Sequence, residues 1–165
     1  MLAPDFCIHY MVLPEQLVPL YHELRRDIMF EASSSRIHQR TLQLFMQKGY
    51  FEQHVRRMRK VYRRKNEQLV ASLQHHFSDH ITILGHHAGM HLVVQIHSEH
   101  SEVELLNIAK EAGIRVASAA FYWNTRKETE QKTFIIGFGG ISIELIDEGI
   151  SLLREVWSPY LLKQK

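Results

Sequence analysis

The sequence is short of cysteine, of long apolar runs and of excess charge. One cysteine among 165 residues excludes an internal disulfide framework and fits a reducing, cytoplasmic setting. No apolar run approaches the roughly 18 to 20 residues of a membrane span, and the first ten residues lack the cationic lead of a secretory signal. The 20 basic residues nearly balance the 18 acidic ones. Composition therefore gives no reason to expect a membrane or a nucleic acid as partner.

Enough apolar residues are present to form one core. The chain is 45% hydrophobic, which at this length predicts a single compact domain or a piece of a larger one. We find no internal repeat and no low-complexity segment.

The opening stretch, residues 7–13, is short and β-favouring, and Pro14 ends it, so it predicts one strand. A strand needs neighbours, and almost nothing precedes this one. We therefore expect the chain to be part of a longer polypeptide.

Helical patterns follow. Residues 14–30 read as a helix that Pro19 breaks or restarts, because proline lacks the N–H group and clashes with the preceding turn. The serines at 33–35 can cap a second helix that runs to Lys48 and stops at Gly49. A third helix of some 25 residues is indicated by apolar residues at helical spacing: Phe51, Val55, Met58, Tyr62, Leu69 and Leu73.

After Asp79 the pattern changes to strands, predicted at Ile81–Leu84, Met90–Ile96, Ile114–Ala117 and Thr133–Phe138. Ser101 and Glu104 form a capping box for a helix that stops at Gly113. Ser142 is the predicted N-cap of the last helix, which ends before Pro159 and carries an apolar stripe of Ile146, Ile150, Leu153 and Trp157. The predicted class is α/β, α+β-like in its second half: helices followed by a small mixed or antiparallel sheet packed against helices.

The third helix carries the densest basic run of the chain: Arg56, Arg57, Arg59, Lys60, Arg63, Arg64 and Lys65. A helix that binds nucleic acid would look similar. The apolar stripe passes through the run at Met58 and Tyr62, however, so the basic residues are what remains on the other faces. We favour a solvated or ion-paired face and keep a basic-helix nucleic-acid-binding module as an alternative.

Eight of the 12 histidines lie between His75 and His100. The pairs at 76/80 and 87/91 have a spacing that can hold a metal on a helix. No cysteine is nearby, and the second pair straddles a glycine and a strand start, so we expect no metal. His91 is interpreted as a hydrogen-bonded structural residue.

Several motifs in order resemble one family. Residues 1–4 and 8–14 resemble its "Ser-Lys-x-Leu-Ala-Pro-x-x-Arg-x-Gly-Tyr" segment, and residues 49–59 its "Gly-His-Tyr-x-x-His-x-Arg-Arg-Met-Arg" helix. Residues 88–92 are similar to its "Gly-Gly-Leu-His-Leu" strand, and residues 136–142 to its closing "Leu-Gly-Phe-Ala-x-Leu-Ser" stretch. The chain thus resembles the carboxyl-terminal part of the aminotransferase-like domain of MocR-type regulators in the GntR family, relatives of the fold-type I aminotransferases.

This resemblance implies a parent protein in which a winged helix is fused to a domain that binds pyridoxal phosphate (PLP) and senses a small amine or amino acid. The parent would dimerise through its large domain. Residues 1–35 would be the tail of that domain, with a strand and a broken helix, 36–76 the connecting helices, and 77–165 the small carboxyl-terminal domain. The resemblance implies no direct DNA contact by this chain.

The departures from the family bear on chemistry. The Schiff-base lysine would lie directly before Met1, and covalent PLP chemistry needs that amine. The family's phosphate-binding arginine falls on Cys7, a following glycine on His9, and the carboxylate-binding arginine on Ile135. Neither a thiol nor an aliphatic side chain replaces a bidentate guanidinium. We therefore expect no enzyme activity and no cofactor in this chain alone; a fragment of a genuine class I/II aminotransferase is the enzymatic alternative.

Overall fold

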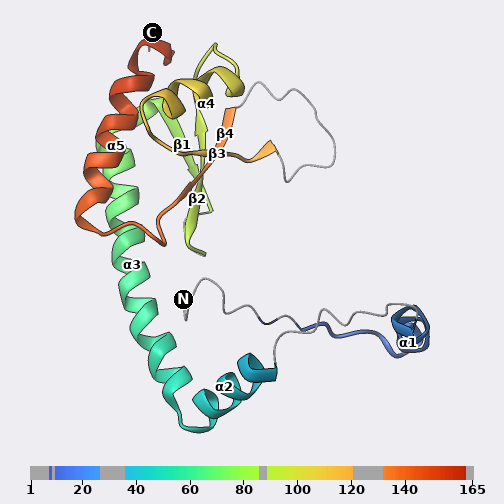
Figure 1. The fold of residues 1–165 in the computed structure, drawn as a ribbon. Coiled ribbons are helices and arrows are strands. Elements are labelled where there is room, and N and C mark those ends of the chain that lie inside the picture. The colour runs from blue at the N-terminus through green and yellow to red at the C-terminus, as the bar shows by residue number, and fades with distance from the viewer. Residues whose placement is uncertain (1–7, 9, 27–35, 86–88, 121–131, 163–165) are drawn as a thin grey trace. The chain divides into compact units, whose positions relative to one another are not determined.

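A computed structural model describes residues 8, 10–26, 36–85, 89–120 and 132–162. The chain divides into two compact units, Met1–Met58 and Arg59–Lys165, which are described separately (Figure 1). Among the described residues, no helix combines the length and the apolar character needed to cross a bilayer.

The first unit holds a short 3-10 helix, η1 (Glu15–Leu17), followed by α1 (Val18–Arg26), α2 (Arg36–Gln47) and the start of α3 (Tyr50–Phe77). Pro19 lies in the first turn of α1, where its missing N–H group removes no helical hydrogen bond. Gly49 separates α2 from α3 with a φ of 73°, a conformation that glycine adopts without a Cβ clash. The predicted restart at Pro19 and stop at Gly49 are confirmed.

The strand predicted over residues 7–13 is absent from the part that is described. Ile8 and residues 10–13 lie in irregular backbone, and the side chains of Tyr10 and Val12 are 91% and 84% exposed. The prediction was wrong there because β-propensity needs a neighbouring strand to pair with, and none of the described strands provides one.

The first unit has no buried residue among its described positions. Aromatic contacts exist, since the Phe45 ring lies 6.0 Å from that of Tyr50, 6.5 Å from that of Phe51 and 6.2 Å from that of His54. Many large apolar side chains nevertheless face outward, among them Leu17, Leu20, Leu24, Ile37, Leu44 and Met46. The described part of this unit therefore lacks a core of its own.

The second unit contains a four-stranded sheet in the order β1 (Ile81–Leu84), β2 (His91–Ile96), β4 (Lys132–Gly137) and β3 (Ala117–Ser118). Every neighbouring pair is antiparallel. The α/β class with helices and a small antiparallel sheet is thereby confirmed.

Of the strand predicted at Ile114–Ala117, only Ala117 belongs to β3. The Ile114 N–H group instead donates to the Ala109 carbonyl oxygen at 2.9 Å. That bond closes the end of α4 (Glu102–Glu111) and removes the donor from any ladder.

One face of the sheet is covered by the second half of α3, by α4 and by α5 (Glu144–Trp157). Figure 1 shows α3 and α5 side by side along this face. Trp157 is completely buried, and its indole N–H group donates to the Leu105 carbonyl oxygen at 2.9 Å. The predicted apolar stripe of α5 is confirmed, because all its members are buried: Ile146, Ile150, Leu153 and Trp157.

The two predicted N-caps differ in outcome. Ser101 and Glu104 form the complete capping box of α4. Ser142 does not cap α5: the N-cap is Ile143, without a side-chain hydrogen bond. The Leu145 N–H group donates to the Ser142 carbonyl oxygen at 3.2 Å, so a tight backbone turn satisfies this end of the helix.

Candidate functional site

Ile135, the position of the expected carboxylate-binding arginine, lies in β4 opposite Val93 of β2 and Ala117 of β3. The ladder places all three on the sheet face opposite the helices, because alternate residues Phe134 and Ile136 belong to the core. No described residue on this second face is buried. The position is thus accessible from outside the core.

The chemistry around Ile135 is apolar. Val93 and Ile135 are half-buried aliphatic residues, and Ala117 carries only a methyl group. None of the three side chains can donate a hydrogen bond to a carboxylate. Cys7 and His9, the other two predicted positions, lie outside the described residues.

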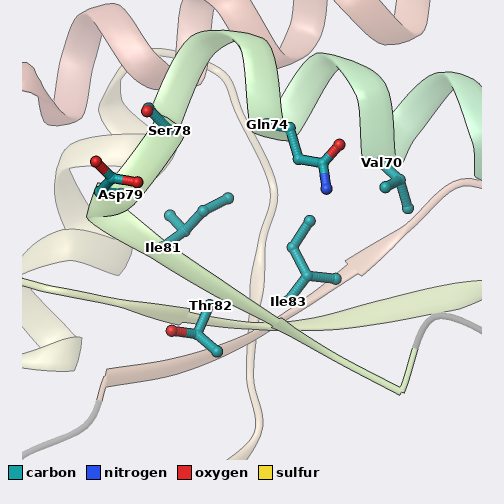
Figure 2. A pocket seen from close by; sticks show the side chains of 7 residues that line it. All are labelled: Val70, Gln74, Ser78, Asp79, Ile81, Thr82 and Ile83. Carbon is teal, nitrogen blue, oxygen red and sulfur yellow. The ribbon is translucent and has the colours of Figure 1, made fainter.

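A hollow of about 500 Å³ lies between the end of α3 and β1 (Figure 2). Its lining combines aliphatic and neutral polar side chains with one carboxylate: Val70, Gln74, Ser78, Asp79, Ile81, Thr82 and Ile83. None of the described lining residues is a cation, whereas a phosphate group is bound through positive side chains or several N–H donors. This hollow does not suit the phosphate of PLP.

The lysines also do not form a cofactor site among the described residues. Lys65 is half-buried, but its Nζ atom donates to the Gly139 carbonyl oxygen at 3.3 Å and lies 5.9 Å from the centre of the Tyr62 ring. A Schiff-base lysine needs a neutral amine in a walled cavity. The Lys65 amine is instead held as a hydrogen-bond donor to a backbone carbonyl, beside an aromatic ring.

The basic run on α3 is solvent-exposed. Six of its side chains are exposed, and no ion pair joins any of them to another described residue: Arg56, Arg57, Arg59, Lys60, Arg63 and Arg64. Met58 and Tyr62 are half-buried on the opposite side of the helix. The face is therefore solvated, one of the two forms that the sequence interpretation favoured.

The histidines do not gather into a metal site in the described part of the chain, where no group of three potential ligands is close enough. His87 lies outside it. The side chain of His91 is exposed and makes no hydrogen bond with another described residue, so its interpretation as a hydrogen-bonded structural residue stays a prediction. It lies on the sheet face that Val93 and Ile135 share, away from the helices.

A polar network between α3 and α5 was missed by the sequence interpretation. Buried Ser72 donates its hydroxyl to Asp147 Oδ1 at 2.7 Å, and His76 Nε2 lies 3.2 Å from the same oxygen. The Ser72 hydrogen bond lowers the pKa of Asp147, and His76 adds to the effect. The serine already acts as a donor to a carboxylate, so this is a structural contact and not a nucleophile paired with a base.

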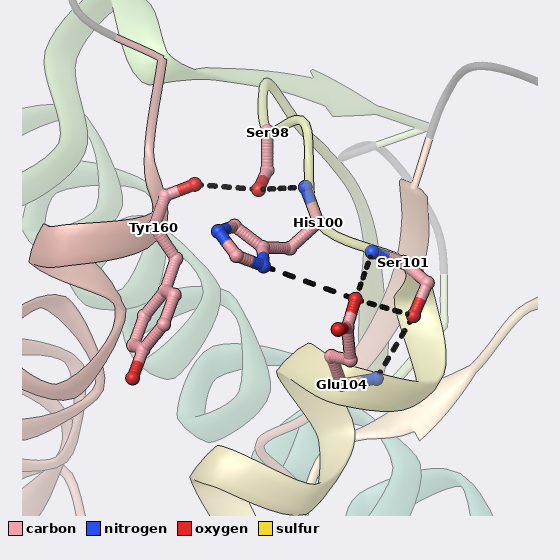
Figure 3. Close-up of polar contacts among 5 residues, drawn as sticks. All are labelled: Ser98, His100, Ser101, Glu104 and Tyr160. Carbon is pink, nitrogen blue, oxygen red and sulfur yellow. Dashed lines mark hydrogen bonds and ion pairs between the residues drawn. The ribbon is translucent and has the colours of Figure 1, made fainter.

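A second polar group joins the loop before α4 to Tyr160, which follows α5 (Figure 3). The Ser98 hydroxyl donates to the Tyr160 carbonyl oxygen, and the His100 ring packs edge-on against the Tyr160 ring with centroids 4.9 Å apart. Backbone and hydroxyl hydrogen bonds from Ser101 lower the pKa of Glu104. The described polar contacts of this group all join residues 98–104 to one another or to Tyr160, so they stabilise this loop structurally.

No protein-family model matches the chain. Over 156 residues it is 31% identical to the uncharacterized HTH-type transcriptional regulator YdeL of Bacillus subtilis (strain 168), a match that covers 94% of this chain and 33% of that protein. It is 29% identical over 158 residues to the probable rhizopine catabolism regulatory protein MocR of Rhizobium meliloti, covering 94% and 31%. The chain is homologous to MocR-type regulators. It spans about a third of the length of these curated relatives.

Solved structures agree on the fold. The multiple substrate aminotransferase of Thermococcus profundus superposes with a TM-score of 0.75 at 15% identity, over 88% of this chain and 35% of that one. LysN, the α-aminoadipate aminotransferase of Thermus thermophilus, gives 0.74 at 18%, over 90% and 36%. At such identities the likeness shows the fold alone. It confirms the resemblance to fold-type I aminotransferases that the sequence motifs indicated.

Proposed function

We propose that the chain is part of the aminotransferase-like, effector-sensing domain of a longer transcriptional regulator. Within that domain it would supply scaffold, contacts to the rest of the domain and one wall of the effector pocket. One observation carries the proposal: the relatives in sequence are regulators, while the fold is that of aminotransferases. A catalytic fold retained in regulators suits ligand sensing without turnover.

The exposed apolar residues of the first unit support the same proposal. An apolar helix face is stable when another surface covers it, and α2 buries none of its residues. The remainder of the longer protein would cover these side chains.

In this proposal the wall of the effector pocket is the open sheet face around Ile135, which would contact an apolar part of the effector.

We further propose that the chain alone performs no PLP chemistry. The experiment is a titration of the purified chain with PLP, followed by absorbance, borohydride reduction and mass spectrometry. We expect scattered, unsaturable adducts on exposed lysines, because no described lysine lines the hollow beside β1. Stoichiometric trapping at one lysine, lost when that lysine is replaced by arginine, would overturn the proposal.

The enzymatic alternative is a fragment of a genuine aminotransferase. Ile135 disfavours it, because an aliphatic residue on the open sheet face cannot form a bidentate pair with a substrate carboxylate. The reading frame before Met1 separates the two hypotheses. A winged helix followed by an aminotransferase-like domain supports the regulator, and an aminotransferase domain without a DNA-binding module supports the enzyme.

The nucleic-acid alternative is favoured by one observation, the exposed basic face of α3. A helix that neutralises phosphates releases counterions, so its affinity for a short duplex falls steeply between about 50 mM and about 200 mM salt. We expect no saturable binding at the lower concentration, because the proposed role of α3 is to carry the core of the second unit. Binding with a steep salt dependence would support the alternative instead.

A further inference from the structure

β1 is an edge strand. It pairs with β2 and with no other strand of the described residues. The His97 N–H group donates to the His80 carbonyl oxygen at 2.9 Å. In an antiparallel ladder the direction of these groups alternates, so the backbone N–H and C=O groups of Ile81 and Ile83 point away from β2. The outer side of β1 thus offers donors and acceptors that no described strand uses.

The hollow lies directly beside this free side. Figure 2 shows the side chains of Ile81 and Ile83 directed from β1 toward Gln74 and Val70 of α3, while Thr82 points away from them. Ile81 is 9% exposed and Ile83 is half-buried. A strand added alongside Ile83 would place every second side chain above the sheet, between β1 and α3. A volume of about 500 Å³ holds several such side chains.

The negative charge of Asp79 limits which segment can bind in the hollow. Asp79 is the one ionisable side chain among the described lining residues. It is exposed, and its carboxylate has no ion-pair partner in the part of the chain that is described. The other lining side chains are aliphatic, amide or hydroxyl groups. The occupant that complements this surface is apolar at alternate positions and cationic near Asp79.

We propose that β1 takes up an extended polypeptide segment as an additional strand, with apolar side chains in the hollow and a lysine or arginine at Asp79. The segment would come from the rest of the longer protein, so the inference rests on the proposed function in that respect. The relatives are about three times as long as this chain, and a segment on the same polypeptide has an effective concentration in the millimolar range. β1 has only four residues and would bind a free peptide weakly. A millimolar effective concentration is enough for a segment of the same polypeptide to occupy it.

The test uses the intact chain and overlapping peptides of about 12 residues, longer than a typical strand. The peptides cover the two thirds of Bacillus subtilis YdeL that this chain does not match. Amide exchange of the isotope-labelled chain is followed by NMR. At a peptide concentration about ten times the dissociation constant, we expect exchange at Ile83 to slow by about tenfold, for one peptide window or two adjacent ones. Failure of every window to slow it would overturn the proposal.

Two variants of Ile83 make the test specific. Ile83→Pro removes an N–H group that takes no part in the β1–β2 ladder, and proline is tolerated on an edge strand. We expect it to abolish peptide binding, measured by peptide fluorescence anisotropy, while protection of the Thr82 amide shows that the ladder is intact. The matched control Ile83→Val keeps the donor and should bind as the parent does. Equal binding by both variants would overturn the proposal.

A third variant does not depend on the ladder. Asp79→Asn should weaken peptides that contain lysine or arginine by about two- to fivefold, the usual strength of an exposed ion pair. If the Ile83 amide is protected in the chain alone and loses protection on dilution, a second copy occupies the edge and the proposed occupant is wrong. The PLP titration is independent of these results: a trapped imine would refute the proposed function and leave amide exchange at β1 unchanged.

Discussion

Asp147 connects the two long helices of the second unit through two contacts from α3. Ser72 donates to its carboxylate at 2.7 Å, and His76 Nε2 lies 3.2 Å away. Next to this network, Arg154 Nε donates to the His76 carbonyl oxygen at 2.9 Å. Ionisation of this carboxylate therefore adds to the apolar packing that holds the two helices together.

This contribution predicts a pH effect. Folding lowers the pKa of Asp147, first through the Ser72 hydrogen bond. The stabilisation is therefore fully present above the ordinary pKa of an aspartate and is lost as the pH falls toward the lowered value. We expect Asp147→Asn to flatten the acid side of a plot of urea midpoint against pH, measured between about pH 6 and about pH 2.

The control for this prediction is Glu148→Gln, which alters an exposed neighbour without a hydrogen bond to another described residue. Its acid side should match that of the parent chain. An Asp147→Asn curve that is indistinguishable from the Glu148→Gln curve would mean that the Ser72 contact contributes nothing.

One member of this network, Ser72, could have been predicted from the sequence. Ser72 lies within the apolar stripe of α3 between Leu69 and Leu73, so a buried hydroxyl in need of a partner could have been expected. Its acceptor is 75 positions away, and periodicity carries no information about such pairings. The neighbours of Ile135 could not be predicted from the sequence for the same reason, because Val93 and Ala117 come from separate strands.

At the scale of the element, α5 offers a matched pair of adjacent leucines. Leu153 is 1% exposed within the core, whereas Leu152 is 43% exposed. Leu153→Ala should lower the free energy of unfolding by about 2–5 kcal/mol, from lost burial plus a cavity. Leu152→Ala should change it by less than about 0.5 kcal/mol. Urea denaturation of both variants measures the difference. Equal decreases in the free energy of unfolding would show that α5 does not pack against the core through the side that carries Leu153.

The start of α4 gives a second prediction at this scale. The Ser101 hydroxyl accepts a hydrogen bond from the Glu104 N–H group, and Glu104 accepts one from the Ser101 N–H group. Ser101→Ala should cost about 1 kcal/mol of stability. Ser151→Ala on the exposed face of α5 is the control and should be neutral or slightly stabilising, since alanine favours helices. Urea midpoints compare the two, and an unchanged midpoint for Ser101→Ala would show that the cap is dispensable.

Elements with strong local signals were predictable from sequence. The long helix α3, the capping box of α4 and the stop at Gly113 depend on residues within a few positions of one another, and all three are confirmed. Of the predicted stripe of α3, Leu69 and Leu73 are buried and the other members are half-buried. The strand start at Ile114 was misassigned because its N–H group donates to the Ala109 carbonyl oxygen, and the cap at Ser142 because a backbone turn to Leu145 takes its place. The strand expected before Pro14 needed a tertiary partner that no local signal can supply.

On the scale of the whole molecule, the two units differ in how they are stabilised. The second contains a continuous core that extends from Leu69 to Leu161. The first exposes its apolar residues and buries none of those described. Stability should therefore be uneven along the chain, because local opening is governed by the amount of buried apolar surface.

Limited proteolysis tests this difference. Chymotrypsin at low concentration should cut first at apolar residues between Tyr10 and Tyr50, many of which are exposed, and leave a resistant fragment that retains the second half of α3 and the sheet. Mass spectrometry of a time course identifies the cuts, and digestion in urea, where both units are unfolded, is the control. Equally rapid cutting within β2 or α5 would contradict the uneven stability. If the rest of a longer protein covers the first unit, the early cuts should be suppressed in that protein, because the same apolar side chains would then be buried.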